Sequence, residues 1–244
     1  MKYSSYIKKR ASIFDKTIEF LEDKVNSTKI CNKIKVPVPI LFHILDKIDD
    51  LKKIKLPENC VIKFNNLACS KGIVIRKENQ FVKYKNIHEV IQYLHKNKTQ
   101  NPHCQISIRN IAQKVIIEEL LFPEEHVLYD IKCYTFYGKV RFIHIINPEK
   151  RNDTYMFDET GKRIYIFERD LQNKTSDLKK PKHYDNIVKY ANKLAQEYCK
   201  KYALRIDFYS TTRGAMFGEF TFNPCAGNGL SEKGDELMGS FLKI

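Results

Sequence analysis

Two carboxylates near the carboxyl end of the chain have the spacing of a metal site. The stretch "RIDFYSTTRGAMFGEFTFNP" reads as two β-strands around a turn. Asp207 follows Arg205 by two residues, and Thr221 follows Glu219 by two, so each pair shares one face of its strand. If the strands pair antiparallel, Asp207 and Glu219 converge, and two such carboxylates repel each other unless a cation lies between them.

Magnesium is the cation that fits this pair. It prefers oxygen ligands, keeps several waters and is typically held by one or two carboxylates together with substrate phosphates. Asn223 could add an amide oxygen. The same residues also fit a surface hairpin with a cross-strand charge pattern, and they do not by themselves decide between the two interpretations.

A lysine in the stretch "VIKFNNLACSKGIVI" is the second candidate. Lys63 lies in an apolar, β-branched run, and a lysine buried there needs an anion. The following loop, residues 65–72, includes Asn65, Ser70 and Gly72, and its small residues would let main-chain N–H groups approach a phosphate. The loop matches neither common glycine-rich phosphate motif. The alternative is an edge-strand lysine in solvent.

The third candidate is "KVIIEELLF", a buried-type strand that runs into two glutamates. Glu118 or Glu119 could accept a hydrogen bond from an amino group while neighbouring backbone groups pair with the edge of a base. The alternative is a plain strand end.

The composition limits the class of protein. The 244 residues carry 43 Lys and Arg against 29 Asp and Glu, a net charge of +14, which favours anionic partners or reflects a biased coding composition. The seven cysteines form no C-x-x-C pair and predict reduced intracellular thiols. With no apolar run of membrane-spanning length and no secretion signal, we expect a cytoplasmic protein.

The elements that would position these residues predict an α+β protein with mainly antiparallel strands. Spacings of three and four predict one amphipathic helix over 3–25, and a short charged helix is expected around 44–53. Further helices are expected at 87–97, 185–202 and 232–241, and a loop at 172–183. The predicted strands are 60–64, 72–76, 80–84, 113–118, 127–137, 139–146, 153–158, 163–167, 204–209 and 215–221, with hairpin turns near 137–138 and 159–161.

Taken together and in this order, "CVIKFNN", "IIEELL", "DIKCYTFYGKVRFI", "RIDFY" and "FGEFTFNPCAGNG" resemble the ATP-grasp fold, specifically the TupA-like ATP-grasp proteins of teichuronopeptide and surface-polysaccharide biosynthesis. The resemblance spans about residues 35–240. It implies two α+β subdomains with mainly antiparallel sheets that clasp a nucleotide, and a reduced amino-terminal region. The implied domains are an amino-terminal helical segment at 1–35, a first subdomain at 36–120 with a phosphate flap at 65–72, and a second at 121–244 with the metal site.

The resemblance also implies roles on the nucleotide side. Lys63 would reach the phosphates beneath the flap. Glu118, with the main chain of Glu119 and Leu120, would hold the adenine edge, and Glu124 or Glu125 would take the ribose hydroxyls.

On the metal side, Asp207 and Glu219 resemble the magnesium ligands. Thr221 stands at the third ligand position, where many ATP-grasp enzymes have asparagine, and Asn223 or water could substitute for it. Arg205 would stabilise charge that develops at an acyl phosphate. Lys132 and Arg141 would line the phosphate or substrate side.

The implied cofactors are ATP and Mg²⁺, and the implied activity is carboxylate–amine ligation through an acyl phosphate. The implied partners are a carboxylate, expected to be a uronic acid of a surface polysaccharide or its precursor, and an amine. The alternatives are an ATP-grasp small-molecule kinase, a nucleotide-binding pseudoenzyme that serves as an assembly partner, and a basic nucleic-acid-binding protein. The last has no motif support, because the lysines are not interleaved with aromatic residues.

Overall fold

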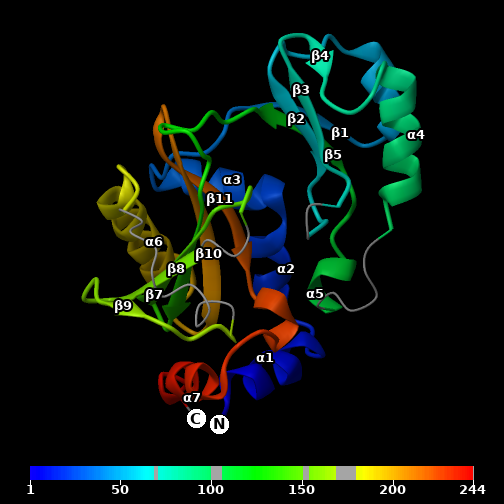
Figure 1. Cartoon of the computed structure of the whole chain (residues 1–244). Helices are drawn as coiled ribbons and strands as arrows, with labels where there is room; N and C mark the ends of the chain where they lie inside the picture. The colour runs from blue at the N-terminus through cyan, green and yellow to red at the C-terminus, as the bar shows by residue number, and fades with distance from the viewer. Residues whose placement is uncertain (69–70, 100–105, 151–153, 169–179, 244) are drawn as a thin grey trace. The chain divides into compact units, whose positions relative to one another are not determined.

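The computed structural model describes residues 1–244 except 69–70, 100–105, 151–153, 169–179 and 244 (Figure 1). The chain divides into two compact units. Unit 1 contains Met1–Phe14, Ile30–Val38 and Phe122–Ile244, and unit 2 contains Asp15–Lys29 and Pro39–Leu121.

The amino-terminal region forms three helices, so the prediction of one helix over 3–25 is wrong. The helices are α1 (Tyr3–Ala11), α2 (Lys16–Glu22) and α3 (Lys24–Lys33). The Asp15 carboxylate accepts hydrogen bonds from the backbone N–H groups of Thr17 and Ile18, which starts a new helix at Lys16. Asp23 accepts likewise from Val25 N and has an extended backbone, so the direction of the chain changes there again. Two aspartate caps therefore interrupt a continuous apolar stripe.

Unit 2 is built on a five-stranded sheet in the order β1-β5-β2-β3-β4, in which every pairing is antiparallel. Its strands are β1 (Leu41–Leu45), β2 (Cys60–Phe64), β3 (Val74–Lys77), β4 (Gln80–Phe81) and β5 (Val115–Glu119). Instead of the charged helix expected around 44–53, the chain forms β1 and then the 3-10 helix η1 (Ile48–Lys53). Leu41, His43 and Leu45 are half-buried while Phe42 and Ile44 are exposed, and this alternation favours a strand.

The core of unit 2 lies on one face of this sheet. Cys60, Ile62 and Phe64 of β2 pack there with Val90 and Leu94 of α4 (Ile87–Asn97). Asn86 caps α4 through its side chain, and the helix has the predicted bounds. A short helix, α5 (Ile106–Arg109), precedes β5.

Unit 1 is built on a six-stranded antiparallel sheet in the order β11-β10-β6-β7-β8-β9. Its strands are β6 (Asp130–Phe136), β7 (Lys139–Ile146), β8 (Thr154–Asp158), β9 (Arg163–Ile164), β10 (Ala203–Thr211) and β11 (Gly214–Thr221). The β6–β7 turn has Tyr137 and Gly138 at φ 50° and 91°, the left-handed pair of a tight hairpin, as predicted.

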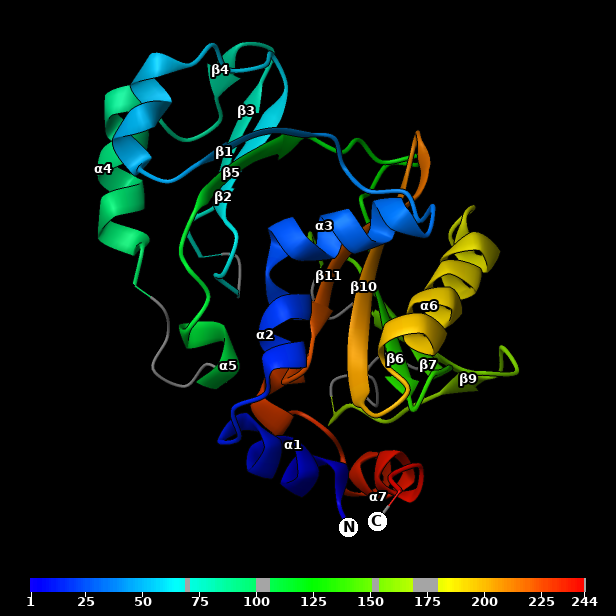
Figure 2. The same cartoon turned by 180° about the vertical axis from the view of Figure 1, so that it is seen from behind.

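Helices cover both faces of the unit 1 sheet. α6 (Tyr184–Tyr198) lies across one face, over β6, β7 and β10 (Figure 2). On the other face, α1 and α7 (Glu232–Ser240) lie side by side and pack with Tyr134, Phe136 and Phe142. The loop predicted at 172–183 falls mostly outside the described residues.

The predicted fold class, α+β with mainly antiparallel sheets, is confirmed by these two sheets. None of the described helices is long and apolar enough to cross a membrane.

Candidate active site

The hairpin β10–β11 brings three of the predicted metal ligands, Asp207, Glu219 and Thr221, to one face of the unit 1 sheet, whereas Asn223 follows the end of β11. Its register pairs Asp207 with Glu219 and Arg205 with Thr221. On the other side of β10, Asp207 is paired with Lys132 of β6. Because side chains alternate along a strand, the convergence of Asp207 and Glu219 expected from the sequence is present in the fold.

Arg205 and Asp207 form a two-point ion pair. Arg205 Nε donates to Asp207 Oδ1 at 2.6 Å and Nη2 donates to Oδ2 at 2.7 Å, and the two side chains are only 9% and 4% exposed. Burial alone would raise the pKa of the Asp207 carboxyl, but Arg205 and then Lys132 outweigh it and hold this pKa below its ordinary value. Asp207 is therefore a fixed anion at neutral pH.

Lys132 extends this charged group to a third strand. Its ammonium lies 3.2 Å from Asp207 Oδ2 and also contacts Asp130. Asp130 was not among the predicted site residues, although its spacing of two from Lys132 indicates a shared face. The next strand places His144 opposite Lys132, where its buried imidazole stacks on Phe167 with the ring centroids 4.7 Å apart.

Glu219 is held less tightly than Asp207. Its side chain is 32% exposed, Thr221 Oγ1 lies 3.3 Å from its Oε1, and Arg205 Nη2 lies 4.0 Å from the same oxygen. The Thr221 hydroxyl also accepts from Arg205 Nη2 at 3.2 Å. Arg205 thus offsets part of the repulsion between the two carboxylates.

The donor set suits a hard cation. Asp207 and Glu219 offer carboxylate oxygens on facing strands, and the Asn223 Oδ1 oxygen is buried without a hydrogen-bond partner among the described residues. Such oxygens are the ligands that Mg²⁺ prefers. Across the part of the chain that the structure describes, no group of three or more His, Cys, Asp or Glu side chains has metal-binding geometry. Any metal here would therefore rest on two carboxylates with other oxygens.

Unit 2 contains a second charged pair on the sheet face opposite its core. Lys63 of β2 forms an ion pair with Glu118 of β5, and the side chains are 16% and 15% exposed. β2 lies between β5 and β3, so Lys63 is not on an edge strand. Phe42, Ile44 and Ile75 are exposed apolar side chains of neighbouring strands in this sheet.

The loop after β2 gives a mixed outcome for the predicted phosphate ligands. Asn65 is fully buried: its Nδ2 donates to Asp23 and to Ala112 O, and its Oδ1 accepts from Lys114 N. Gly72 has φ +69°, and a Cβ there would lie 2.8 Å from Phe64. Ser70 lies outside the described residues. A phosphate contact by any of the three stays a prediction.

The remaining predicted ligands on the nucleotide side lie at or after the end of β5. Glu119 N donates to Ile40 O, and Glu119 Oε2 accepts from Ile40 N at 3.1 Å. Leu120 and Leu121 are half-buried. Glu124 contacts Lys182, whereas Glu125 is exposed. These positions leave the proposed adenine and ribose contacts untested.

Asp207, Arg205, Lys132 and Glu219 together are called the Asp207 group. Arg141 lies in a different environment from this group. Its Nη1 donates to Glu159 at 2.7 Å, and its guanidinium lies over the Phe241 ring at 5.1 Å. No ion pair or hydrogen bond among the described residues connects it to Asp207 or Glu219.

The family profile described as TupA-like ATPgrasp matches residues 5–243. The chain belongs to the TupA-like ATP-grasp family. This membership confirms the resemblance read from the sequence, and the match includes Lys63, Glu118, Asp207 and Glu219. A comparison with curated proteins gives no match.

Solved structures share the ATP-grasp fold at low sequence identity. D-alanine-D-alanine ligase from Helicobacter pylori is 16% identical with a TM-score of 0.57, over 93% of this chain and 62% of that one. VanG D-Ala:D-Ser ligase from Enterococcus faecalis is 15% identical with a TM-score of 0.55, over 91% and 62%. The biotin carboxylase domain of Hydrogenobacter thermophilus 2-oxoglutarate carboxylase, solved with MgADP and bicarbonate, is 17% identical with a TM-score of 0.50, over 84% and 40%. The chain thus spans less than two thirds of the length of each of these proteins.

Proposed function

We propose that this TupA-like ATP-grasp protein is an ATP-dependent carboxylate–amine ligase. Family membership supports the proposal, as do the names of similar solved structures, which include a D-alanine-D-alanine ligase and a D-Ala:D-Ser ligase. The observation that carries it is the Asp207 group: two facing carboxylates on adjacent strands with an arginine and a lysine beside them. This arrangement places carboxylate oxygens, which are suitable metal ligands, next to two cations whose positions are fixed by ion pairs.

In the proposed reaction, a carboxylate oxygen of the substrate attacks the γ-phosphorus of ATP, and the bond to the β-phosphate oxygen breaks to give ADP and an acyl phosphate. An amine nitrogen then attacks the activated carbonyl, the bond from the carbonyl carbon to the phosphate oxygen breaks, phosphate leaves, and the nitrogen releases a proton to solvent as the amide forms. Most of the catalysis is electrostatic, because negative charge collects first on the transferred phosphoryl group and then on the carbonyl oxygen.

In this proposal, Arg205 and Lys132 are the cations that stabilise the negative charge on the phosphoryl group and the carbonyl oxygen. The carboxylate of Asp207 fixes the plane of the Arg205 guanidinium through two hydrogen bonds, so the cation is oriented before substrate arrives. Lys132 is tethered to Asp130 and Asp207. Groups held in this way need little reorganisation during the reaction, which is the source of their effect.

Asp207 and Glu219 would hold Mg²⁺, with Thr221 or the unpartnered Asn223 Oδ1 as further oxygen ligands. When bound, Mg²⁺ would neutralise phosphate charge. The partial exposure of Glu219 leaves room for water or a phosphate oxygen beside it.

In unit 2, the proposal assigns Lys63 to the nucleotide phosphates, and Glu118 with the main chain of Glu119 and Leu120 to adenine. Two residues of unit 1 are also assigned: Glu125 would hold the ribose hydroxyls, and Arg141 would line the substrate side. Asn65, Ser70 and Gly72 would belong to the phosphate flap. The ion pair between Lys63 and Glu118 supports a binding role, because a lysine held by one carboxylate can exchange it for a phosphate.

We further propose a uronic acid of a surface polysaccharide, or its precursor, as the carboxylate and a small amino compound as the amine. The net charge of +14 supports a polyanionic acceptor. A cytoplasmic location is part of the proposal, because the described cysteines, Cys31, Cys60, Cys133, Cys199 and Cys225, are free thiols.

The deciding experiment measures ADP release with ATP and Mg²⁺ across pairs of uronic acids and amines. A ligase releases ADP only when both co-substrates are present, and Glu219→Gln should abolish that release. Glu236→Gln, an exposed position on α7, is the matched control and should keep full activity. ADP release with a single hydroxyl acceptor would instead establish a kinase, and ATP binding without turnover under every pair would establish a pseudoenzyme.

A further inference from the structure

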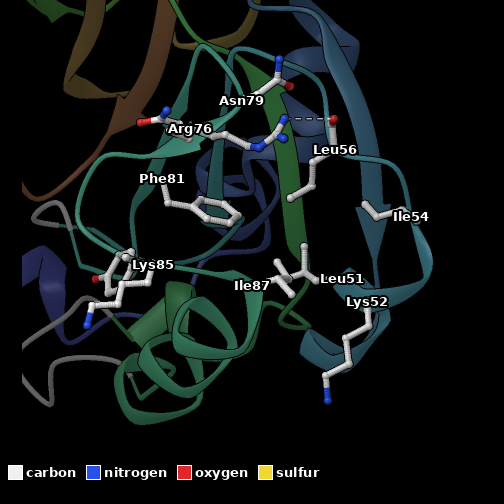
Figure 3. A pocket seen from close by; sticks show the side chains of 11 residues that line it. Leu51, Lys52, Ile54, Leu56, Arg76, Asn79, Phe81, Lys85 and Ile87 are labelled. Carbon is white, nitrogen blue, oxygen red and sulfur yellow. Dashed lines mark hydrogen bonds between the residues drawn. The ribbon is translucent and has the colours of Figure 1, made fainter.

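Unit 2 contains a cavity of about 500 Å³ that the proposed reaction does not use (Figure 3). η1, the β3–β4 hairpin and the start of α4 form its walls. The lining residues are Leu51, Lys52, Ile54, Leu56, Arg76, Asn79, Gln80, Phe81, Tyr84, Lys85 and Ile87. Its volume lies within the range of ordinary small-molecule sites.

The cavity lies on the core side of the unit 2 sheet, whereas Lys63 points to the other side. Leu51, Ile54 and Ile87 of the lining pack with the same apolar cluster as Cys60, Ile62 and Phe64. Residues of alternating number point to opposite faces of a strand, so Lys63 and this cavity are separated by the sheet itself.

Arg76 is the main polar group of the cavity. Its Nη1 donates to Leu56 O at 3.1 Å and also contacts Pro57 O, and its guanidinium carbon lies 5.9 Å from the centre of the Phe81 ring. No carboxylate of the described residues forms an ion pair with it. Backbone carbonyls orient the guanidinium without neutralising it, and a partly buried cation of this kind attracts an anion.

The charged side chains in the described lining are all basic, although Glu89 Oε2 accepts a hydrogen bond from Lys85 N nearby. Lys52 and Lys85 join Arg76 in the lining, and no aspartate or glutamate does. Asp49 pairs weakly with Lys52, at 3.5 Å with both side chains about half exposed. Figure 3 shows both lysines far from Arg76 with their ammonium groups directed away from the cavity, so Arg76 is the cation that a bound anion would meet directly.

The floor between these cations is apolar and aromatic. Phe81 extends into the middle of the cavity between Arg76 and Ile87, and Leu51 and Leu56 line the wall beside it (Figure 3). Tyr84 adds a second ring, which lies against Tyr93 with the ring centroids 5.1 Å apart. Flat apolar surface of this kind favours a ligand with a ring over a bare inorganic ion.

We propose that this cavity binds a small ring-bearing organic anion, with its carboxylate or phosphate on Arg76 and its ring against Phe81. A sugar acid, a sugar phosphate and an aromatic acid share this chemistry. This cavity lies on the opposite side of the unit 2 sheet from Lys63. The proposal for the cavity can therefore be tested independently of the ligase proposal.

The test is calorimetric titration of the full chain with four probes: glucuronate, glucose 6-phosphate, benzoate and neutral glucose. We expect at least one anionic probe to bind with a Kd below about 10 mM, and glucose not to bind in that range. Saturating ATP analogue should leave the Kd of the anion unchanged. The probe with the lowest Kd shows whether the cavity prefers a sugar acid, a sugar phosphate or an aromatic acid. Failure of all three anions to bind, or equal binding of glucose, overturns the proposal.

Arg76→Gln removes the charge while keeping most of the volume and should weaken the anion about tenfold or more. Lys77→Gln is the matched control one residue along β3, outside the lining, and should change the Kd less than about twofold. Phe81→Leu should weaken ring-bearing anions, whereas Val82→Ala, also outside the lining, should not. If Arg76→Gln does not fold, as judged by circular dichroism, Arg76→Lys replaces it and should still weaken binding because the planar fork is lost. If the Arg76 and Lys77 variants change the Kd of the anion equally, the assignment of Arg76 is contradicted. Both variants should bind the ATP analogue with wild-type affinity, which separates this result from the test of the ligase proposal.

Discussion

The two charged groups of the molecule differ in how firmly the protein holds them. In unit 1, Arg205 and Asp207 are joined by two hydrogen bonds and are 9% and 4% exposed, with Lys132 bound to the same carboxylate. In unit 2, Lys63 and Glu118 form a simpler pair with side chains 16% and 15% exposed. The first pair is held by more contacts, and we therefore expect the second pair to exchange partners more easily.

This difference suits the two roles that we propose for these groups. A guanidinium fixed in a buried network keeps its orientation and charge, which is what stabilisation of a developing anion requires. A lysine on a flexible stem can leave a carboxylate and meet a phosphate with little rearrangement of the backbone. We therefore expect substitutions in the first group to reduce stability more than those in the second.

The largest expected effect is that of Asp207→Ala. It leaves the buried Arg205 guanidinium without its carboxylate, and loss of one partner of such a pair costs about 3–5 kcal/mol. Urea denaturation followed by circular dichroism measures the loss. A change in the free energy of unfolding below about 1 kcal/mol would show that the network does not hold Arg205 in place.

Acid should weaken the same interaction. The folded-state pKa of Asp207 is below its ordinary value of 3.8, so the stability that it contributes is fully present above that value. It is lost as the pH falls through the lower folded-state pKa. The difference in free energy of unfolding between the wild type and Asp207→Asn should stay constant from about pH 6 to 5 and shrink below about pH 4. A difference that grows on acidification would contradict this pKa direction.

Glu118→Ala should have a smaller effect on stability, about 1–2 kcal/mol, because Lys63 is partly exposed and can turn toward water. The same urea measurement gives the comparison with Asp207→Ala. If Glu118→Ala and Asp207→Ala lower the free energy of unfolding by the same amount, the two ion pairs do not differ in how firmly the protein holds them.

Two glycines give the smallest expected difference. Gly214 has φ +102°, and among the described residues none apart from its two chain neighbours comes within 4 Å of the position that a Cβ would take there, so Gly214→Ala should cost only the backbone strain, about 1 kcal/mol. Gly72 has φ +69°, and a Cβ at this position would also lie 2.8 Å from the Phe64 ring. Gly72→Ala should therefore cost about 1 kcal/mol more than Gly214→Ala. Thermal unfolding of the two variants compares them. A cost for Gly72→Ala no larger than that for Gly214→Ala would mean that Phe64 moves aside.

Local patterns predicted much of this fold because local interactions determine it. The helix at 87–97 has an Asn86 cap and an apolar stripe, and the β10–β11 hairpin sets the register that pairs Asp207 with Glu219. The amino-terminal prediction failed because an apolar stripe with period 3.6 says nothing about the caps at Asp15 and Asp23 that divide the helix.

Long-range pairings were beyond prediction from local pattern. The contact between Lys63 and Glu118 depends on β5 lying beside β2, and about fifty residues separate the two strands in the chain. Asp130 could have been found from its spacing to Lys132, but the bond from Lys132 to Asp207 required the β6–β10 register. The hydrogen bonds of Asn65 are a further example: its side chain is bonded to Asp23 and Lys114, which are 42 and 49 residues away in the chain.

The central proposal is that Lys63 binds nucleotide phosphates and that Glu219 of the Asp207 group binds Mg²⁺. The most direct measurement is calorimetric titration of the wild type, Lys63→Ala, Glu219→Gln and the double variant with a non-hydrolysable ATP analogue, with and without Mg²⁺. We predict that Lys63→Ala weakens binding about tenfold or more in both conditions and that Glu219→Gln removes the increase in affinity caused by Mg²⁺. Wild-type affinity and full Mg²⁺ dependence in both single variants would contradict the account.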